Sequence, residues 1–272
     1  MKNDFCFPTL FIPHGGGPCF FMDPPPDHPT LWDKMAAYLR GIDGSLGRRP
    51  EAVLVISGHW DAAIPTVNSS IASPLLFDYF GFPEHTYRLT YPAPESPAVA
   101  ARVRELLAKE GTSCDEDEHR GLDHGVFVPF KLIYPDADVP IVQLSLQRGL
   151  DPMTHLAIGR ALAPLRKEGV LIVGSGMSYH NLQSFFVDDP RVNRPAEEFD
   201  EWLNDAVTAL AGTSRADQLA EWQGAPGALA AHPTPEHLLP LMVAAGAAEG
   251  DWATRTYSDR LLGKPISGFQ FG

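Results

Sequence analysis

The stretch Ala52-Val-Leu-Val-Ile-Ser-Gly-His-Trp60 says most about the fold of this chain. Its first five residues, 52–56, form a continuous apolar run, which is typical of a β-strand buried on both faces of a parallel sheet. His59 follows after two small residues, so we expect it just past the carboxyl end of that strand. Open α/β sheets bind their ligands at this edge. The stretch therefore predicts an α/β fold with a site at the strand ends.

The rest of the chain predicts further strands and helices around this one. Residues 74–97, rich in Pro, Gly and aromatic residues, are predicted to be a long irregular loop that forms a wall or lid of a site. No repeat, charge run or Gly/Ser linker divides the chain, so we expect a single catalytic α/β domain over residues 1–272, with a central, mostly parallel mixed sheet flanked by helices. Apolar runs predict strands at 9–12, 139–145 and 169–174, and helical spacing predicts helices at 31–39, 97–109, 152–167, 195–211 and 235–248.

Composition narrows the classes of function. The net charge is −13 without any basic run, which argues against binding nucleic acid phosphates or an anionic membrane surface. No apolar run approaches the roughly 18 residues of a membrane span, and the first apolar stretch, broken by Pro8 and Pro13, is too short for a signal peptide. Three cysteines without a CxxC pair favour a reducing compartment. We therefore expect a cytoplasmic protein; the sequence leaves its oligomeric state open.

Histidines within short motifs are the main functional signal. Neutral imidazole is the commonest metal ligand in proteins, so several histidines converging on one cleft would form a metal centre. Because at least three of these motifs follow predicted strands, the sequence predicts a metal site at the strand ends. The motifs are Phe-Ile-Pro-His14-Gly-Gly-Gly-Pro18, Ile-Ser-Gly-His59-Trp60, Leu-Asp-His124-Gly125, Gly-Met-Ser-Tyr-His180-Asn181 and His232-Pro-Thr-Pro-Glu236-His237.

His14 and His59 are the strongest candidate ligands, because each follows a predicted strand and has small residues beside it. The third ligand is either Glu236, giving a set of two histidines and one carboxylate, or His237, giving three histidines. Spacing does not choose between them. Glu236 has an alternative role in the first turn of a helix for which Thr234 would be the N-cap.

Two of the other histidines are candidates for a catalytic or ligand role, and the rest are assigned no role. His180 follows a predicted strand on a glycine-containing loop, where it is suited to act as a general acid or base or as a fourth ligand. His124 is a second acid/base candidate or a structural residue. His232 is predicted to face solvent in a loop, and no role is assigned to the histidines in polar or loop surroundings, namely His28, His85, His119 and His155.

Several other chemistries lack their signatures. The Gly15-Gly16-Gly17 loop has no lysine followed by serine or threonine, so it is not a P-loop, and no GxGxxG follows a strand. No GxSxG elbow and no HExxH helix occur.

Taken together, the motifs resemble the DODA-type (4,5-DOPA) extradiol dioxygenases of the class III, LigB-like superfamily. Two segments differ from the usual pattern: Gly-Gly-Gly-Pro18 stands after His14 where Gly-Ser-Pro is usual, and Ser57-Gly58-His59 replaces Ser-Ala-His. The matching motifs run in family order over nearly the whole chain: His14-Gly15, Ser57-Gly-His-Trp60, Gly81-Phe-Pro83, Tyr91-Pro-Ala-Pro94, Leu122-Asp-His-Gly125, Tyr134-Pro-Asp-Ala-Asp138, Pro140-Ile-Val-Gln-Leu-Ser145, His180-Asn-Leu182 and Pro233-Thr-Pro-Glu-His237.

The resemblance implies a non-haem Fe(II) enzyme, with Zn(II) as the alternative metal, that cleaves the ring of a small aromatic diol with O2. It implies metal-binding positions at His14, His59 and His237, His180 as a ligand or catalytic base, and His124 in the pocket. Phe20, Phe21, Trp60 and Phe127 are candidates to hold the ring. Two other hypotheses are a zinc hydrolase of a small amide or ester and a non-enzymatic, Memo-like binding protein.

Overall fold

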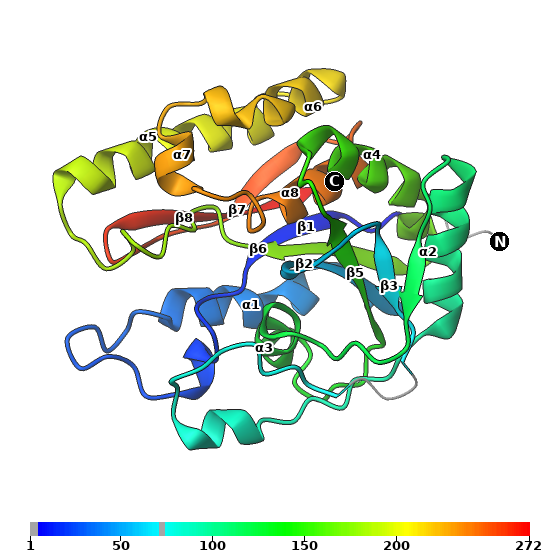
Figure 1. The fold of residues 1–272 in the computed structure, drawn as a ribbon, viewed down its shortest axis with the longest axis horizontal. Coiled ribbons are helices and arrows are strands. Elements are labelled where there is room, and N and C mark those ends of the chain that lie inside the picture. Colours follow the sequence, from blue (N-terminus) through cyan, green and yellow to red (C-terminus); the bar gives the residue numbers. More distant parts are fainter. Residues whose placement is uncertain (1–4, 71–73) are drawn as a thin grey trace.

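The computed structural model describes residues 5–70 and 74–272, so the first four residues of the predicted domain and residues 71–73 lie outside it. The described chain forms a single α/β domain around one mixed eight-stranded sheet, as predicted (Figure 1). The strand order is β4-β3-β5-β2-β6-β1-β8-β7. The strands are β1 (Thr9–Pro13), β2 (Ala52–Ala62), β3 (Thr66–Asn68), β4 (Asp115–Asp117), β5 (Ile141–Gln147), β6 (Val170–Gly176), β7 (Ala253–Leu261) and β8 (Lys264–Phe271).

The centre of the sheet is parallel and its margins are mixed. Strand β6 pairs in parallel with β1 on one side and with β2 on the other, and β2 pairs in parallel with β5. The pairs β1–β8, β7–β8 and β3–β5 are antiparallel. Parallel pairing places the carboxyl ends of β1, β6 and β2 side by side, which is the edge at which the sequence predicts the site.

Helices cover both faces of this sheet. Helices α4 and α8 pack together on one face, α1 and α3 pack on the other, and α5 lies along the β7–β8 hairpin (Figure 1). Among the described residues, no helix is both long and apolar enough to cross a membrane. The helices are α1 (Asp33–Ser45), α2 (Pro97–Lys109), α3 (His124–Ile133), α4 (Pro152–Leu162), α5 (Pro190–Thr208), α6 (Thr213–Ala220), α7 (Ala228–Ala231) and α8 (Leu239–Ala247).

Several predicted boundaries were wrong for local reasons. Strand β2 continues to Ala62 beside β5 after a register shift between Ile56 and Asp61, so His59 lies in the irregular part of the strand instead of beyond it. Helix α5 begins five residues earlier than predicted, at Pro190, because the Asp189 side chain caps it by accepting from Arg191 N–H. Residues 163–167 form a 3-10 turn after α4.

The last predicted helix also starts later than expected. Thr234 does not cap it, since its hydroxyl instead donates to the Glu236 carboxylate at 2.9 Å. Residues 235–238 form a turn closed by a hydrogen bond from Leu238 N–H to the Pro235 carbonyl, and α8 begins only at Leu239. This turn, and not the helix, carries His237.

Some elements were absent from the prediction. Helix α3 (HGVFVPFKLI) contains Pro129 and several β-branched or aromatic residues, so local propensity argues against a helix. It forms because nine of its residues are buried against the rest of the molecule. The β7–β8 hairpin and the short strands β3 and β4 were also missed.

Candidate metal centre

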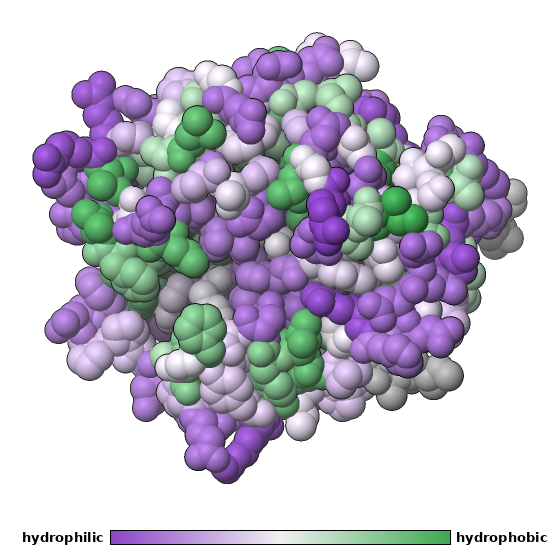
Figure 2. Space-filling model, in the orientation of Figure 1, coloured by the Kyte–Doolittle hydropathy of each residue, from purple (hydrophilic) through white to green (hydrophobic). Residues whose placement is uncertain are grey.

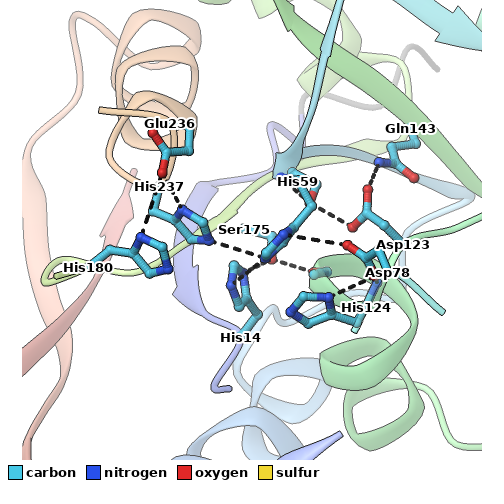
Figure 3. Close-up of polar contacts among 12 residues, drawn as sticks. His14, His59, Asp78, Asp123, His124, Gln143, Ser175, His180, Glu236 and His237 are labelled. Carbon is cyan, nitrogen blue, oxygen red and sulfur yellow. Dashed lines mark hydrogen bonds and ion pairs between the residues drawn. The ribbon is translucent and has the colours of Figure 1, made fainter. Parts of the chain in front are cut away.

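Three histidines meet at the carboxyl edge of the central strands (Figure 3). His14 follows β1, and its backbone N–H donates to the Gly176 carbonyl at 3.2 Å, at the end of β6. His59 lies in β2 beyond the last residue that pairs with β6. His237 is tied to the same edge because Met177 N–H donates to its carbonyl at 3.1 Å. Viewed as in Figure 1, the surface is mostly hydrophilic and is hollowed left of centre, near where β1 and β6 end (Figure 2).

The three imidazoles turn the same ring nitrogen toward one another. Nε2 of His59 lies 3.1 Å from Nε2 of His14 and 3.1 Å from Nε2 of His237. One ligand atom from each of the three residues lies within 4.8 Å of the others. Such convergence of ring nitrogens is the arrangement in which histidines bind one metal ion.

The opposite nitrogen of each ring faces an acceptor. Nδ1 of His14 lies 3.2 Å from the Ser175 hydroxyl, whose own hydrogen is donated to the Gly125 carbonyl, so the hydroxyl accepts from His14. Nδ1 of His59 lies 3.5 Å from an Asp78 carboxylate oxygen, and Nδ1 of His237 lies 3.4 Å from a Glu236 carboxylate oxygen. These two are charge contacts and not hydrogen bonds, and the buried Nδ1 of His237 has no hydrogen-bond partner among the described residues.

These partners decide whether the site fits a metal. An acceptor at Nδ1 favours the tautomer with hydrogen on Nδ1, which leaves a bare lone pair on Nε2. Three Nε2 lone pairs pointing at one another repel unless a cation lies between them. The donor set and its outer partners therefore fit a bound divalent metal ion.

Burial keeps these rings neutral. Burial, reinforced by the neighbouring histidines, lowers the pKa of His14 and of His237 well below the usual histidine value. Burial, with repulsion from His124 second, also lowers the pKa of His59 to about 3. Metal binding requires neutral imidazole, so this environment favours ligation.

His124 lies beside the three histidines at the start of α3. Its ring centroid is 3.9 Å from that of His59 and 5.6 Å from that of His14. Nδ1 of His124 is 2.8 Å from Oδ1 of Asp78. Burial alone would raise the pKa of the Asp78 carboxyl, but hydrogen bonds from His124 and electrostatic interaction with His124 and His59 lower it overall.

His180 lies on the other side of His237. The two rings are stacked, with centroids 3.4 Å apart and planes 13° apart, and Nδ1 of His180 is 3.7 Å from the Glu236 carboxylate. The Glu236 carboxylate thus faces the Nδ1 side of His237, away from the shared Nε2 position. Between the two residues that the sequence left open, His237 is the one whose side chain joins His14 and His59.

A buried carboxylate supports the β2 end of the site. Asp123 accepts hydrogen bonds from Ser57 Oγ at 2.7 Å and from the side chains of Gln143 and Arg120. Burial raises the pKa of Asp123, with repulsion from Asp78 second. Arg120 also donates to the His59 carbonyl at 3.2 Å. This network fixes the backbone that carries His59.

Not all predictions for the other residues were right. His232, predicted to face solvent, is completely buried next to Phe199 and Trp222, and its Nε2–H donates to the Ser178 carbonyl at 2.9 Å. His155, placed in polar or loop surroundings, is buried within α4.

The aromatic candidates for holding a ring also differ from one another. Phe127 is fully buried against Phe77 and Tyr79, so it belongs to the core. Trp60 is buried with the Arg120 guanidinium over its ring, whereas Phe20 and Phe21 are half-buried.

Two residues whose side chains contact the candidate imidazoles were not found from sequence. Asp78 contacts both His59 and His124, and Ser175 contacts His14. Neither stands in a motif with metal-ligand spacing. The only signal for Asp78 was its position in the 74–97 segment, which was predicted to form a site wall.

Comparison with known proteins gives one consistent result. The family model described as the catalytic LigB subunit of aromatic ring-opening dioxygenase matches residues 8–270. Dioxygenase tasH of Hapsidospora irregularis is 37% identical, over 97% of this chain and 85% of the relative. The 4,5-DOPA dioxygenases extradiol of Beta vulgaris and Escherichia coli K12 are 41% and 35% identical, over 88% and 89% of this chain and 86% of each relative.

Structural similarity agrees with the sequence match. The crystal structure of an uncharacterized protein from Escherichia coli K12 has a TM-score of 0.76 and 30% sequence identity, over 98% of this chain and 100% of that one. None of these similarities supports the zinc hydrolase or the Memo-like hypothesis. The chain belongs to the LigB family, and it is a metal-dependent aromatic ring-opening dioxygenase of the extradiol type.

Proposed function

We propose that this enzyme cleaves catechol-type diols, DOPA or a related compound, between a hydroxylated carbon and its unhydroxylated neighbour. The relatives named for 4,5-DOPA support this substrate class. In such a reaction both atoms of O2 enter the product, and the ring opens to a muconic semialdehyde type of compound. The Gly15–Phe21 region, in which this chain departs from the usual motif, is where we expect selectivity among catechols to be determined.

The observation that carries the proposal is the convergence of His14, His59 and His237 through Nε2. We propose that these three side chains hold Fe(II). Zinc has no redox chemistry, whereas ring opening by O2 requires electron transfer. When bound, ferrous ion would bring the diol and O2 together and let electrons pass between them.

The flanking histidines are the proposed proton acceptors. A catechol must lose hydroxyl protons as it binds, and a neutral imidazole within reach can take them. His124 and His180 each have Nδ1 turned to a carboxylate, which leaves Nε2 free. Burial lowers the pKa of His180, which also favours a neutral ring. We assign His180 this role in preference to ligation, because it groups with Glu236 and His237 and not with His14 or His59.

We further propose that the whole chain acts as one catalytic domain in the cytoplasm. The sheet that presents the site is completed by β8, near the end of the chain. The cysteines Cys6, Cys19 and Cys114 are free, as expected in a reducing compartment.

An oxygen-electrode experiment tests the proposal. The protein is loaded anaerobically with Fe(II) and mixed with DOPA, protocatechuate, caffeate or simple catechols, with tyrosine as the monophenol control. We expect O2 uptake equal to substrate consumed, with the visible absorbance of a semialdehyde, for at least one diol and none for tyrosine. Zinc-loaded protein should consume no O2. Absence of uptake with every diol would refute the proposed substrate class.

A further inference from the structure

One carboxylate, that of Asp78, lies between two histidines with different proposed roles (Figure 3). Its Oδ1 accepts from the backbone N–H of His124 at 3.0 Å and from Nδ1 of the same residue at 2.8 Å. Its Oδ2 faces Nδ1 of His59 at 3.5 Å. The Asp78 side chain is 19% exposed, although the residue as a whole is exposed, so its carboxylate is partly shielded from solvent.

A carboxylate at this position favours one of the two tautomers of each neighbouring imidazole. An ionised carboxylate only accepts hydrogen bonds, so a ring nitrogen facing it is favoured when it carries hydrogen. Hydrogen on Nδ1 leaves Nε2 without one. In His59 that Nε2 points at Nε2 of His14 and of His237, and in His124 it is free to accept a proton.

We propose that Asp78 is a positioning residue that holds hydrogen on Nδ1 of His59 and of His124 at once, and thereby keeps one Nε2 open for the metal and the other open for a substrate proton. This inference rests on the proposed function, in which His59 is a ligand. Asp78 acts through the two histidines and is not itself placed on the metal or the substrate.

The contact to the His124 backbone adds a second effect. His124 is the first residue of α3, and the side chain of the preceding Asp123 makes no capping hydrogen bond. Asp78 supplies the missing acceptor from a distant loop, which fixes the start of the helix as well as the ring. The Glu236 carboxylate faces His237 and His180 similarly, but at the longer distances of 3.4 Å and 3.7 Å.

The substitution Asp78→Asn removes the second acceptor oxygen while keeping the size of the side chain. Asparagine has nearly the same size, and its oxygen would remain where it meets the two donors of His124. Its NH2 group would then face Nδ1 of His59. That nitrogen must become an acceptor, which moves the hydrogen of His59 to Nε2 and into the position shared by the three histidines.

Zinc affinity is the first measurement, made on the full-length chain by competition with a chromogenic chelator. We expect Asp78→Asn to bind zinc ten- to a hundredfold more weakly than the wild type, the usual range for loss of an outer partner of a ligand. Asp138→Asn, which removes a surface ion pair with Arg49, is the matched control and should bind as the wild type does. An affinity within twofold of the wild type in Asp78→Asn would overturn the inference.

Nitrogen-15 NMR of labelled histidine supplies a readout independent of metal binding. In the chelator-treated wild type we expect His59 and His124 with hydrogen on Nδ1, and in Asp78→Asn we expect His59 with hydrogen on Nε2. An unchanged His59 tautomer would overturn the inference. Variants His59→Gln and His124→Gln assign the signals.

The variant Asp78→Glu tests whether a change of side-chain shape alone weakens zinc binding. It retains two acceptor oxygens, so we expect its zinc affinity to lie closer to the wild type than that of Asp78→Asn. Equal loss in both variants would mean that shape matters and the acceptor does not, which would also overturn the inference. If the wild type itself bound no zinc, the proposed three-histidine site would fail first, and the two failures are therefore distinguishable.

Discussion

Buried neutral histidines serve this chain in two ways at the residue scale. At the site, His14, His59 and His237 keep one nitrogen free of hydrogen. Elsewhere, both nitrogens of His155 are used: Nδ1–H donates to the Asp151 carbonyl at 2.7 Å, and Nε2 accepts from Gln147 N–H at 3.1 Å. This neutral ring joins the end of β5 to the start of α4, and protonation would remove its acceptor.

The lowered pKa of His155 should make the stability of the folded chain depend on pH. Burial lowers its pKa in the folded chain below the unfolded value of about 6.5. As pH falls through about 6.5, the unfolded chain takes up a proton that the folded chain refuses, so the free energy of unfolding decreases. We expect His155→Leu to lower the free energy of unfolding by about 1–3 kcal/mol near neutral pH, because the Asp151 carbonyl and Gln147 N–H lose their hydrogen-bond partner. On acidification, the variant should lose less additional stability than the wild type.

Urea denaturation at about pH 7.5 and pH 5 measures both quantities. Equal losses on acidification in the wild type and in His155→Leu would show that His155 does not bind its proton differently in the two states.

Local sequence predicted the main site residues but not their surroundings. His14 and His59 follow apolar runs, and the structure brings them together as that setting predicts. His232 was predicted wrongly because its burial depends on Phe199 and Trp222, which approach from α5 and from a 3-10 turn. Asp78 reaches His124 across 46 positions of sequence, and no spacing rule signals such a contact.

At the element scale, strand β6 is shaped so that another segment can cross it closely. A Cβ on Gly176 would lie 2.1 Å from the His237 carbonyl oxygen, and one on Gly174 would lie 2.2 Å from the Pro240 carbonyl oxygen. Gly58 in β2 similarly faces the Glu236 backbone, with 3.0 Å between a built Cβ and its carbonyl oxygen. Glycine at these positions lets the turn carrying His237 lie directly on the strand ends.

Gly176→Ala should therefore damage the site through the backbone. The added methyl group cannot avoid a carbonyl oxygen, so the 235–238 turn must shift and His237 with it. We expect a loss of about 1–3 kcal/mol in the free energy of unfolding and weaker zinc binding. The matched control is Gly41→Ala in α1, where a Cβ meets nothing within 4 Å; alanine there should stabilise by up to about 1 kcal/mol. Chemical denaturation and zinc titration that gave wild-type values for Gly176→Ala would contradict this.

The elements that sequence predicted best are those with strong local patterns. The central strands β2 and β6 begin with continuous apolar runs, and α2 combines the Ser96 cap, Pro97 at its first position and an amphipathic face. Helix α3 and the turn at 235–238 could not be predicted from local sequence patterns. Tertiary burial overrides propensity in the first, and the Thr234–Glu236 hydrogen bond replaces a cap in the second.

At the scale of the whole molecule, the site depends on the complete sheet. Its proposed ligands come from residues 14, 59 and 237, and adjacent strands β2, β6 and β1 bring them together. Hydrophobic patterning predicted the parallel centre, but the strand order follows from non-local packing and was not predictable from one sequence. Because the three nitrogens meet only in the folded chain, metal binding and folding should be linked.

Metal should consequently stabilise the whole fold. A ligand at a hundred times its dissociation constant adds about 2.7 kcal/mol when it binds only the folded state. We expect a matching rise in the thermal midpoint of the wild type on adding zinc, and none in His237→Ala. Equal stabilisation of both proteins would show that zinc binds elsewhere.

The most direct test of the account is the metal content of the purified chain after Fe(II) or Zn(II) loading and desalting. We predict close to one ion per chain in the wild type and in the exposed-loop control His28→Ala. His14→Ala, His59→Ala and His237→Ala should retain little or none. Wild-type metal content in any of these three variants would contradict the assignment of that histidine, and in all three it would refute the proposed centre.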